Sequence, residues 1–478
     1  MNLYINHGFH YELENLTRLF YPNEKITVIK DSDEYTKPYI KAFRNENLSV
    51  EVKSGDFSEF STAHVSYDVE DERMLCELLY KILCKLTGVT PPWGMITGVR
   101  PVKLYRNLLT AENADYADKY FKDKLFVSDE KIKLAKITEK NEKKFIDLSR
   151  KDSFSLYIAI PFCPTRCHYC SFVQSSIERS KHLVEPYVEL LCKELEYTAK
   201  IVSELNLRLE TVYMGGGTPT TLTAEQMNRV LSVINNSFDM STCREFTVEA
   251  GRPDTITEDK LNSILENNVD RISINPQTLN NNVLEAIGRH HSAEQTIEAY
   301  NLARKVGFNN INMDLIAGLP TDTVDSFKST LDKITELNPE CVTVHTLSMK
   351  RSSSLTQNGT SINRDDAVNT AKMLSYANER LLQSEYLPYY LYRQSKMVGN
   401  LENTGWSKKG FESLYNIYVM DETHTILGCG AGAVTKLKRF GTTYLERIFN
   451  FKYTYEYINR YNEILDRKKN ICTFYGNC

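Results

Sequence analysis

Apolar and polar positions alternate in a regular rhythm between about residues 156 and 350. Short apolar runs predict strands, and six of them follow one another in this order: LYIAIPF, TVYMGGG, EFTVEAG, RISINPQ, INMDLIAG and CVTVHTLSM. The intervening segments, including 182–206, 257–266 and 293–306, place apolar residues at helical spacing with charged residues between them. Six strands that alternate with helices predict parallel βα units, which curl into a barrel or part of one.

The regions before and after this alternating segment contain both strand-like and helical patterns. Before residue 150, strand-like runs such as KITVIKD and LSVEVKSG accompany a helical stretch at about 70–86. After residue 355, helices at 365–384 and 453–465 enclose three strand-like pieces: YYLYRQS, LYNIYVMDE and THTILGCG. We therefore expect an α/β protein with three domains: an N-terminal α+β domain at 1–150, a partial (β/α)6 barrel at 151–355, and a small C-terminal α+β domain at 356–478 that closes the active site.

Composition narrows the class of protein. Hydrophobic residues make up 41% and charged residues 25% of the 478 positions, which is ordinary for globular domains. The net charge is −4 with no basic stripe, so nucleic acid is not an expected partner. No apolar run reaches the roughly 20 residues of a membrane helix, and the N-terminus lacks a signal-peptide pattern. We expect a cytoplasmic protein, in which the 11 cysteines do not form a disulfide framework.

Three of the cysteines stand close together in the segment IPFCPTRCHYCSF. Cys163, Cys167 and Cys170 have C-x3-C-x2-C spacing and follow the first predicted barrel strand directly. Three thiolates in such a loop could hold three irons of an iron–sulfur cluster and leave the fourth iron open to another ligand. The alternative is a zinc site with His168 as fourth ligand, although paired C-x2-C hooks are absent.

Polar residues and glycines gather at the ends of the later predicted strands, where parallel βα folds carry their chemistry. Gly215, Gly216 and Gly217 end the second strand, where backbone N–H groups could approach a carboxylate or the chain could form a plain tight turn. Glu249 and Asp314 lie late in the third and fifth strands, and an unpaired carboxylate is costly to bury. Each is therefore either a ligand-binding group or half of a structural ion pair.

The cysteine spacing after a barrel strand resembles that of the radical S-adenosylmethionine (SAM) superfamily. Further segments in the same order resemble the oxygen-independent coproporphyrinogen III oxidase family, and particularly its HemZ-type branch: LYIAIPFCPTRCHYC, YMGGGTPT, TVEAGRPD, NPQTLN, IGRHH and NMDLIAGLP. The GGGTPT element is the most specific of these segments. The likeness covers about residues 155–355 and is weaker in the C-terminal region.

This resemblance implies two cofactors: a 4Fe-4S cluster on the three cysteines, and SAM bound to the open iron through its amino and carboxylate groups. An electron from the cluster then cleaves SAM to a 5′-deoxyadenosyl radical. Tyr157, Gly216 and Glu249 match positions that contact this SAM. A second SAM molecule is implied beside it, at the positions matched by Tyr169, Gly217, Thr218, Gln277, Arg289 and Asp314. Ser348 and Val434 match further SAM positions by alignment alone.

The resemblance also implies a reaction. The radical takes a β-hydrogen from a propionate side chain of coproporphyrinogen III, carbon dioxide leaves, an electron passes to an acceptor, and a vinyl group remains. Two such steps give protoporphyrinogen IX in haem biosynthesis. The implied partners are a tetrapyrrole substrate and an electron donor such as flavodoxin or ferredoxin. Because the substrate carries four carboxylates, cations are expected near the barrel mouth, and the candidates are Arg252, Lys350, Arg351 and Arg393.

Two segments depart from the family pattern. Phe172 stands where the family's oxidases have a further cysteine, and LYNIYVMDE stands where its haem-chaperone branch has HNxxYW. Three functions are therefore open: dehydrogenation of coproporphyrinogen III, transport of haem, and radical chemistry on another tetrapyrrole such as haem methylation. A haem carrier needs an axial ligand, for which His290, His291, His345 and several tyrosines are candidates.

Overall fold

The computed structural model describes residues 1–32, 34–67, 70–171, 175–350, 353–357, 363–394 and 396–476. Two residues singled out from the sequence, Phe172 and Arg351, lie outside these ranges. The chain folds into two compact units. Unit 1 comprises Met1–Glu139, Thr360–Ala371 and Tyr392–Glu402, and unit 2 comprises Lys140–Gly359, Lys372–Leu391 and Asn403–Cys478. The division into domains at residues 151 and 356 stays a prediction.

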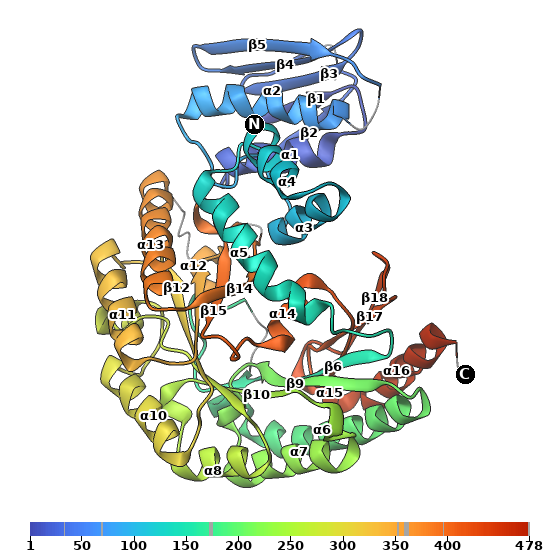
Figure 1. Ribbon diagram of the computed structural model, residues 1–478, viewed down its shortest axis with the longest axis vertical. Helices are drawn as coiled ribbons and strands as arrows, with labels where there is room; N and C mark the ends of the chain where they lie inside the picture. Colours follow the sequence, from blue (N-terminus) through green and yellow to red (C-terminus); the bar gives the residue numbers. More distant parts are fainter. Residues whose placement is uncertain are drawn as a thin grey trace. The chain divides into compact units, whose positions relative to one another are not determined.

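Unit 1 is built on a five-stranded sheet in the order β2-β1-β3-β4-β5 (Figure 1). Its strands are β1 (Asn2–Ile5), β2 (Thr27–Lys30), β3 (Tyr39–Arg44), β4 (Asn47–Ser54) and β5 (Phe57–His64). Strand β4 buries every second residue, as expected for a sheet with one covered face. The helices of this part of the chain are α1 (His10–Phe20), α2 (Glu70–Thr87), α3 (Pro101–Ala111), α4 (Ala114–Lys119) and α5 (Asp129–Ile146).

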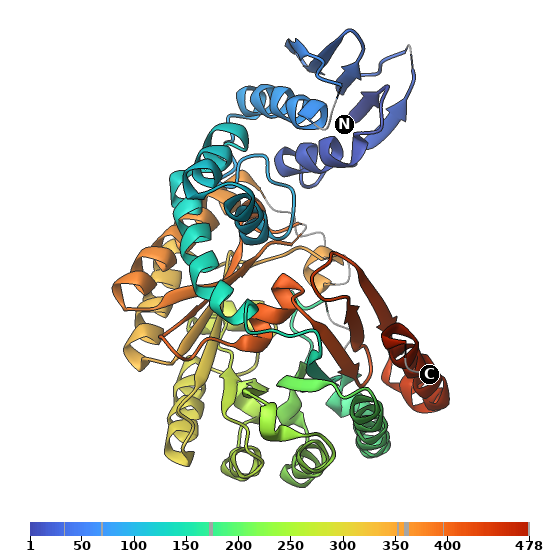
Figure 2. The same cartoon turned by 45° about the vertical axis from the view of Figure 1, so that its right-hand side comes forward.

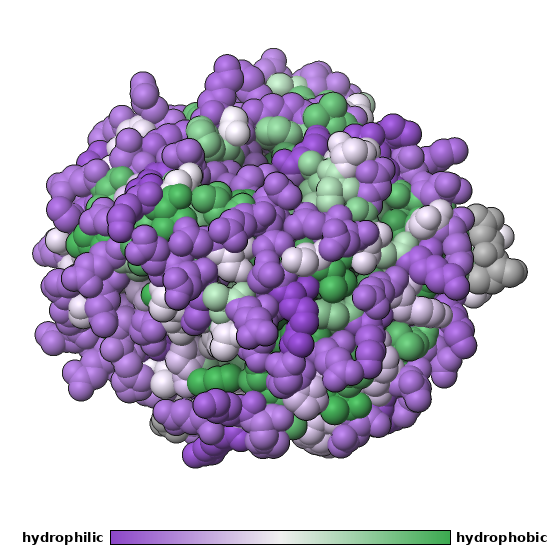
Figure 3. Space-filling model, turned by 90° about the horizontal axis from the view of Figure 1, so that it is seen from below, coloured by the Kyte–Doolittle hydropathy of each residue, from purple (hydrophilic) through white to green (hydrophobic). Residues whose placement is uncertain are grey.

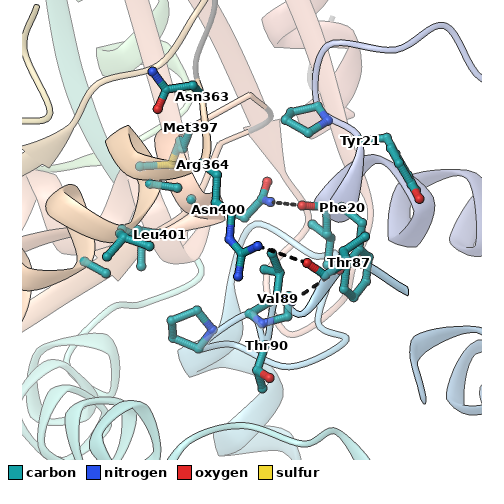
Figure 4. Close-up of a pocket in the computed structure, with 18 of the residues that line it drawn as sticks. Phe20, Tyr21, Thr87, Val89, Thr90, Asn363, Arg364, Met397, Asn400 and Leu401 are labelled. Atoms are coloured by element: carbon teal, nitrogen blue, oxygen red, sulfur yellow. Dashed lines mark hydrogen bonds between the residues drawn. The ribbon is translucent and has the colours of Figure 1, made fainter. Parts of the chain in front are cut away.

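Unit 1 also contains a cavity of about 520 Å³ between the ends of α1 and α2 (Figure 4). The last carbonyls of a helix have no hydrogen-bond donor within the helix, and at this cavity side chains donate to them instead. The guanidinium of Arg364 donates to the carbonyls of Thr87 and Gly88, at 3.3 and 3.1 Å, and Asn400 donates to Leu19 at 3.0 Å. Most of the remaining labelled wall is apolar: Phe20, Tyr21, Val89, Met397 and Leu401.

Arg393, predicted as a cation near the barrel mouth, is buried within unit 1. Its Nη1 donates to the carbonyl of Ile96 at 2.5 Å, and its Nε and Nη2 donate to the carbonyl of Asn400 at 3.2 and 2.8 Å. Burial lowers its pKa to about 10. Because backbone carbonyls occupy its donors, the prediction of a substrate-binding cation is wrong for Arg393.

The core of unit 2 is a row of six adjacent parallel strands, which confirms the predicted partial barrel (Figures 1 and 2). They are β6 (Ser153–Ile160), β9 (Arg208–Gly216), β10 (Glu245–Gly251), β11 (Arg271–Ile274), β12 (Ile311–Ala317) and β13 (Cys341–Thr346). The connecting helices line the outer side of this row: α6 (Ile177–Glu204), α7 (Ala224–Ser237), α8 (Glu258–Glu266), α9 (Asn281–Ala286), α10 (Ala293–Val306) and α11 (Val324–Leu337). Capping boxes at Thr223 and Ser292 fix where α7 and α10 begin.

C-terminal strands extend this row at both edges, so that the described residues form one eleven-stranded sheet. Beyond β13 come β15 (Asn403–Ser407) and β14 (Leu387–Tyr392), and beyond β6 come β16 (Thr425–Cys429), β17 (Val434–Lys438) and β18 (Leu445–Phe449). Strand β16 pairs with β6 in parallel, whereas β15 pairs with β13 antiparallel. The helices of this region are α12 (Ser354–Gln357), α13 (Arg364–Gln383), α14 (Leu414–Asp421), α15 (Thr454–Asn459) and α16 (Tyr461–Tyr475).

The prediction of a strand at LYNIYVMDE is wrong, because this segment forms helix α14. Its first turn is fixed from outside the helix. The hydroxyl of Ser413 accepts from the N–H of Asn416 and donates to the buried carboxylate of Glu245, which also accepts from the N–H of Leu414. The helix is buried on several sides, so its sequence lacks the polar face by which an amphipathic helix is recognised.

Among the described helices, none has both the length and the apolar character needed to cross a membrane. On the face seen in Figure 3, hydrophilic side chains predominate and apolar ones form small, separate patches.

Candidate functional site

The three clustered cysteines lie in the loop that follows β6. Cys163 ends the two-residue strand β7 (Phe162–Cys163), which pairs with β8 (Ser175–Ser176). Cys167 and Cys170 lie in a turn closed by a hydrogen bond of 3.1 Å from the N–H of Cys170 to the carbonyl of Cys167. Cys163 and Cys167 are buried and Cys170 is half-buried. The three thiols are thus presented together at the carboxyl end of the first barrel strand.

The imidazole of His168 faces away from this group of thiols. Its Nδ1 lies 3.0 Å from the carbonyl of Ala286 at the end of α9, and its backbone N–H donates to the carbonyl of Ile287 at 2.9 Å. A Cβ atom on Gly288 would lie 2.9 Å from the His168 ring, so glycine is needed there. His168 therefore ties the loop to α9. Because its imidazole is held against α9, His168 is not placed as a fourth ligand beside the cysteines, which disfavours the zinc alternative.

Besides Arg289, which hydrogen-bonds Cys167, two polar side chains contact the cysteine sulfurs. The hydroxyl of Thr218 lies 3.3 Å from Sγ of Cys163, and Nη1 of Arg252 lies 3.8 Å from Sγ of Cys167. Burial raises the pKa of the Cys163 thiol to about 12, so a thiolate here needs a strong compensating charge. Iron supplies such a charge, and the donors are placed to support bound sulfur. The group of side chains therefore fits an iron–sulfur cluster, in which each thiolate binds its own iron.

The glycines at the end of β9 join this strand to the cysteine loop. The N–H of Gly217 donates to the carbonyl of Ile160, and that of Thr218 to the carbonyl of Phe162, both at 2.7 Å. A Cβ atom on Gly217 would lie 2.5 Å from the Phe162 oxygen, which explains the requirement for glycine. A Cβ atom on Gly215 would lie 2.7 Å from the carboxylate of Glu249, so this glycine makes room for that side chain.

Glu249 lies in a group of aromatic side chains. The hydroxyl of Tyr213 donates to its carboxylate, and the Tyr213 ring stacks on Tyr415 from α14 with 4.4 Å between ring centroids. Tyr157 stacks 6.3 and 6.2 Å from these two rings. Burial, with the charge of Asp314 nearby, raises the pKa of Glu249 to about 7. Among the described residues no lysine or arginine forms a salt bridge with Glu249, which disfavours the ion-pair alternative for it.

Asp314 has a different environment. Its carboxylate accepts from the amide of Asn312 at 2.7 Å and lies 3.7 Å from Nε2 of His345. Burial would raise the pKa of Asp314, but these partners hold it below its ordinary value. The two strand carboxylates therefore differ, with Asp314 ionised and Glu249 close to half-protonated at neutral pH.

Gln277 and Arg289 are buried with polar atoms that have no hydrogen-bond partner in the described part of the chain: Oε1 of Gln277 and Nε of Arg289. Gln277 lies three positions beyond β11, with a positive φ of 67°, and its backbone bridges to Leu315. Arg289 follows α9, and its Nη1 donates to the carbonyl of Asn275 at 2.5 Å. Burial alone would lower the pKa of Arg289, but neighbouring Tyr169 and Cys167 raise it. Native proteins seldom bury polar atoms without partners, so these atoms indicate a ligand.

A cavity of about 150 Å³ adjoins the cysteine loop. Tyr157, Gly216 and Gly217 line it as the sequence suggested, and Ser171 and Lys452 line it as well. Lys452 is an exposed cation that sequence reasoning missed, because it comes from the C-terminal region with no motif around it. Tyr213 and Tyr415 lie in the segments TVYMGGG and LYNIYVMDE, but neither aromatic ring was singled out from the sequence.

The remaining predicted residues lie at strand ends or outside the site. Ser348 and Lys350 are half-buried just after β13, and Val434 begins β17. Arg252 is only 2% exposed and forms a two-pronged ion pair with Asp254, so its prediction as a substrate-binding cation is wrong. His291 is buried, His290 is exposed, and His345 lies beside Asp314.

Comparisons with known proteins agree with this fold. The family model described as the radical SAM superfamily matches residues 157–334. The chain is 38% identical over 473 residues to the oxygen-independent coproporphyrinogen-III oxidase-like protein HemZ of Bacillus subtilis (strain 168), covering 96% of this chain and 94% of that protein. It is 32% identical over 286 residues to the heme chaperone HemW of Lactococcus lactis subsp. lactis (strain IL1403), covering 58% and 68%.

Among solved structures, coproporphyrinogen III oxidase (HemN) from Escherichia coli, described as a radical SAM enzyme, superposes with a TM-score of 0.53. The identity is 23%, over 67% of this chain and 71% of that one, which is a likeness of fold. The chain therefore belongs to the radical SAM family of HemN and HemZ proteins. Its cofactors are those of the superfamily, a 4Fe-4S cluster and SAM.

Proposed function

We propose that this protein is a radical SAM oxidoreductase that converts two propionate side chains of coproporphyrinogen III to vinyl groups, giving protoporphyrinogen IX without oxygen. The observation that carries the proposal is the 38% identity to the HemZ protein, which extends over 96% of this chain. A similarity of that length includes unit 1 and the C-terminal strands, not only the barrel.

In this proposal, Cys163, Cys167 and Cys170 hold the cluster. When bound, the cluster and SAM supply one-electron chemistry that removes a hydrogen atom from the substrate. Glu249 binds the amino group of the first SAM beside Tyr157 and Gly216. The second SAM is contacted by Tyr169, Gln277 and Arg289, together with Gly217, Thr218, Asp314, Ser348 and Val434. The unpartnered atoms of Gln277 and Arg289 support this assignment, since a ligand would supply their missing partners.

Lys452 is proposed to bind a carboxylate of the tetrapyrrole, because it is a cation that lines the cavity beside the cysteine loop. A small redox protein such as flavodoxin or ferredoxin would supply the electron. Thiolate ligation and a low-potential electron donor both suit a reducing, cytoplasmic location.

The test is an anaerobic incubation of the reduced, cluster-loaded protein with SAM and coproporphyrinogen III. The expected products are carbon dioxide and protoporphyrinogen IX, detected after oxidation to the porphyrin. A Cys167→Ala variant is the matched control and should give neither product. Methyl transfer to haem, or cleavage of SAM with no vinyl product, would contradict the proposal.

A second candidate is a haem carrier, which the similarity to the heme chaperone HemW favours. Of the three histidine candidates, His290 is exposed, next to Arg289 in the chain, and is therefore accessible to haem. Titration with haem under the same anaerobic conditions distinguishes the two functions. Stoichiometric binding that is lost in His290→Ala, together with no turnover of coproporphyrinogen III, would favour the carrier.

A further inference from the structure

Arg252 stands at a fixed point of the backbone, directly after β10. Its N–H donates to the carbonyl of Ala250 at 2.6 Å, and its own carbonyl accepts from the N–H and the hydroxyl of Thr255 at 3.0 and 2.8 Å. The next residue, Pro253, begins a short helical turn over Pro253–Thr255. This turn fixes the direction in which the long side chain of Arg252 leaves the strand.

The side chain of Arg252 is directed to the cysteine loop by an ion pair. Its Nε and Nη2 donate to the two carboxylate oxygens of Asp254 at 3.0 and 2.9 Å. This pairing leaves Nη1 on the opposite side of the planar guanidinium. Nη1 donates to the hydroxyl of Thr165 at 2.9 Å and to Sγ of Cys167 at 3.8 Å. The residue is 2% exposed, so its charge is held against the sulfur away from water.

Neighbouring charged groups do not replace this contact. Arg289 also hydrogen-bonds Cys167, but its guanidinium is shared with Tyr169 and is assigned to the proposed second SAM site. On the other side, Nδ1 of His291 lies 4.0 Å from Asp254, and the burial of His291 lowers its pKa to about 3, which leaves its imidazole neutral. Of the two buried arginines that contact Cys167 in the described part of the chain, Arg252 is the one that the proposed SAM sites do not use.

We propose that Arg252 raises the reduction potential of the cluster through its N–H···S contact with Cys167, and that Asp254 moderates this effect. The inference depends on the proposed cluster ligands. Reduction adds one electron to the cluster and no proton, so the thiolates gain negative charge. A donor and a positive charge at the sulfur stabilise this more negative state, and the carboxylate of Asp254 offsets part of that stabilisation.

The test compares variants of the full-length, cluster-loaded protein: Arg252→Met, Arg252→Lys and Asp254→Asn. Iron content is measured first. The midpoint potential is then determined in the absence of SAM by an anaerobic titration with dithionite that is monitored by electron paramagnetic resonance. The matched control is Arg229→Met on α7, which removes an exposed arginine paired with Glu185. Its potential should equal that of the unaltered protein.

The two sites should shift the potential in opposite directions. For Arg252→Met we expect the equilibrium constant for reduction to fall about tenfold, which is about 59 mV more negative for one electron. Arg252→Lys should give a smaller negative shift because it keeps the charge. Asp254→Asn should give a positive shift, because it leaves the guanidinium uncompensated. This opposite sign separates an electrostatic role from a structural one.

Cluster-loaded variants with unchanged potentials, or with shifts of the same sign, would overturn the proposal and leave the proposed function intact. If Arg252→Met loses iron, the proposal is judged from the signs of the potential shifts in Arg252→Lys and Asp254→Asn. An unaltered protein that binds no cluster would overturn this proposal and the proposed function together.

Discussion

Two of the cavities in the described part of the chain differ in how their polar groups are satisfied. The larger one, in unit 1, is about 520 Å³, and its arginine and asparagine donate to carbonyls at the ends of α1 and α2. The smaller one, in unit 2, is about 150 Å³ and lies in the same barrel as the unpartnered atoms of Gln277 and Arg289. The arginine and asparagine of the first cavity thus have partners without a ligand, whereas the two polar atoms in the barrel of the second do not. The ligand assignment rests on these missing partners together with the predicted site, because buried polar atoms without partners also occur in unit 1, at His7 and Tyr80.

The largest expected effect follows from removing a proposed cluster ligand. Cys167→Ala should abolish the brown chromophore and the bound iron, because an alanine leaves one iron without a protein ligand. Absorption spectra and iron analysis after anaerobic reconstitution measure this. Cys243→Ala is the control, since this half-buried cysteine lies outside the site and should leave the iron content unchanged. Full iron content in Cys167→Ala would contradict the cluster assignment.

The next effect concerns Glu249 and SAM. Glu249→Gln should weaken SAM binding roughly 10–100-fold, because a hydrogen bond to a charged group contributes about 1.5–3 kcal/mol. With a pKa of about 7, Glu249 is protonated below neutral pH, and it accepts hydrogen bonds from the amino group of SAM more strongly once it has lost this proton. SAM affinity should therefore rise about tenfold from pH 6 to pH 8.

Equilibrium dialysis of SAM at both pH values measures this prediction on the cluster-loaded protein. Glu249→Gln should show a smaller pH-dependent rise, since it has no carboxyl group to ionise. An equal rise in the variant would assign the titration to another group.

A third prediction uses the missing partner of Gln277. Gln277→Met should raise the free energy of unfolding of the metal-free protein by about 1 kcal/mol, because it removes a buried acceptor that has no donor. The same change should weaken SAM binding. Denaturant unfolding and SAM dialysis measure the two effects. A destabilised variant would indicate that the amide has a structural role.

The smallest effect is expected at the cavity of unit 1. Arg364→Met should lower the free energy of unfolding by about 0.5–1 kcal/mol, because two carbonyls at the end of α2 lose an exposed donor. Iron content and SAM affinity should not change. A loss of SAM binding in this variant would remove the distinction between the two cavities.

Much of the barrel could be predicted from local signals. The six strands are short apolar runs separated by helical spacing, and the C-x3-C-x2-C motif marks the loop after the first strand. The contact of Tyr213 with Tyr415 could not be predicted, because it joins β9 to a buried helix that has no polar face. The burial of Arg252 was also hidden, since an arginine before Pro-Asp is typical of an exposed turn. Long-range packing determines both features.

The pairing of β6 with β16 has a consequence for the order in which the protein is made. Strand β6 precedes the cysteine loop, and its second neighbour, β16, lies far along the chain from it. A ribosome that adds about 5–20 residues per second reaches β16 roughly 15–50 seconds after β6, since about 270 residues separate them. One edge of the strand that carries the cysteine loop therefore lacks its hydrogen-bonded neighbour until all of these residues have been added.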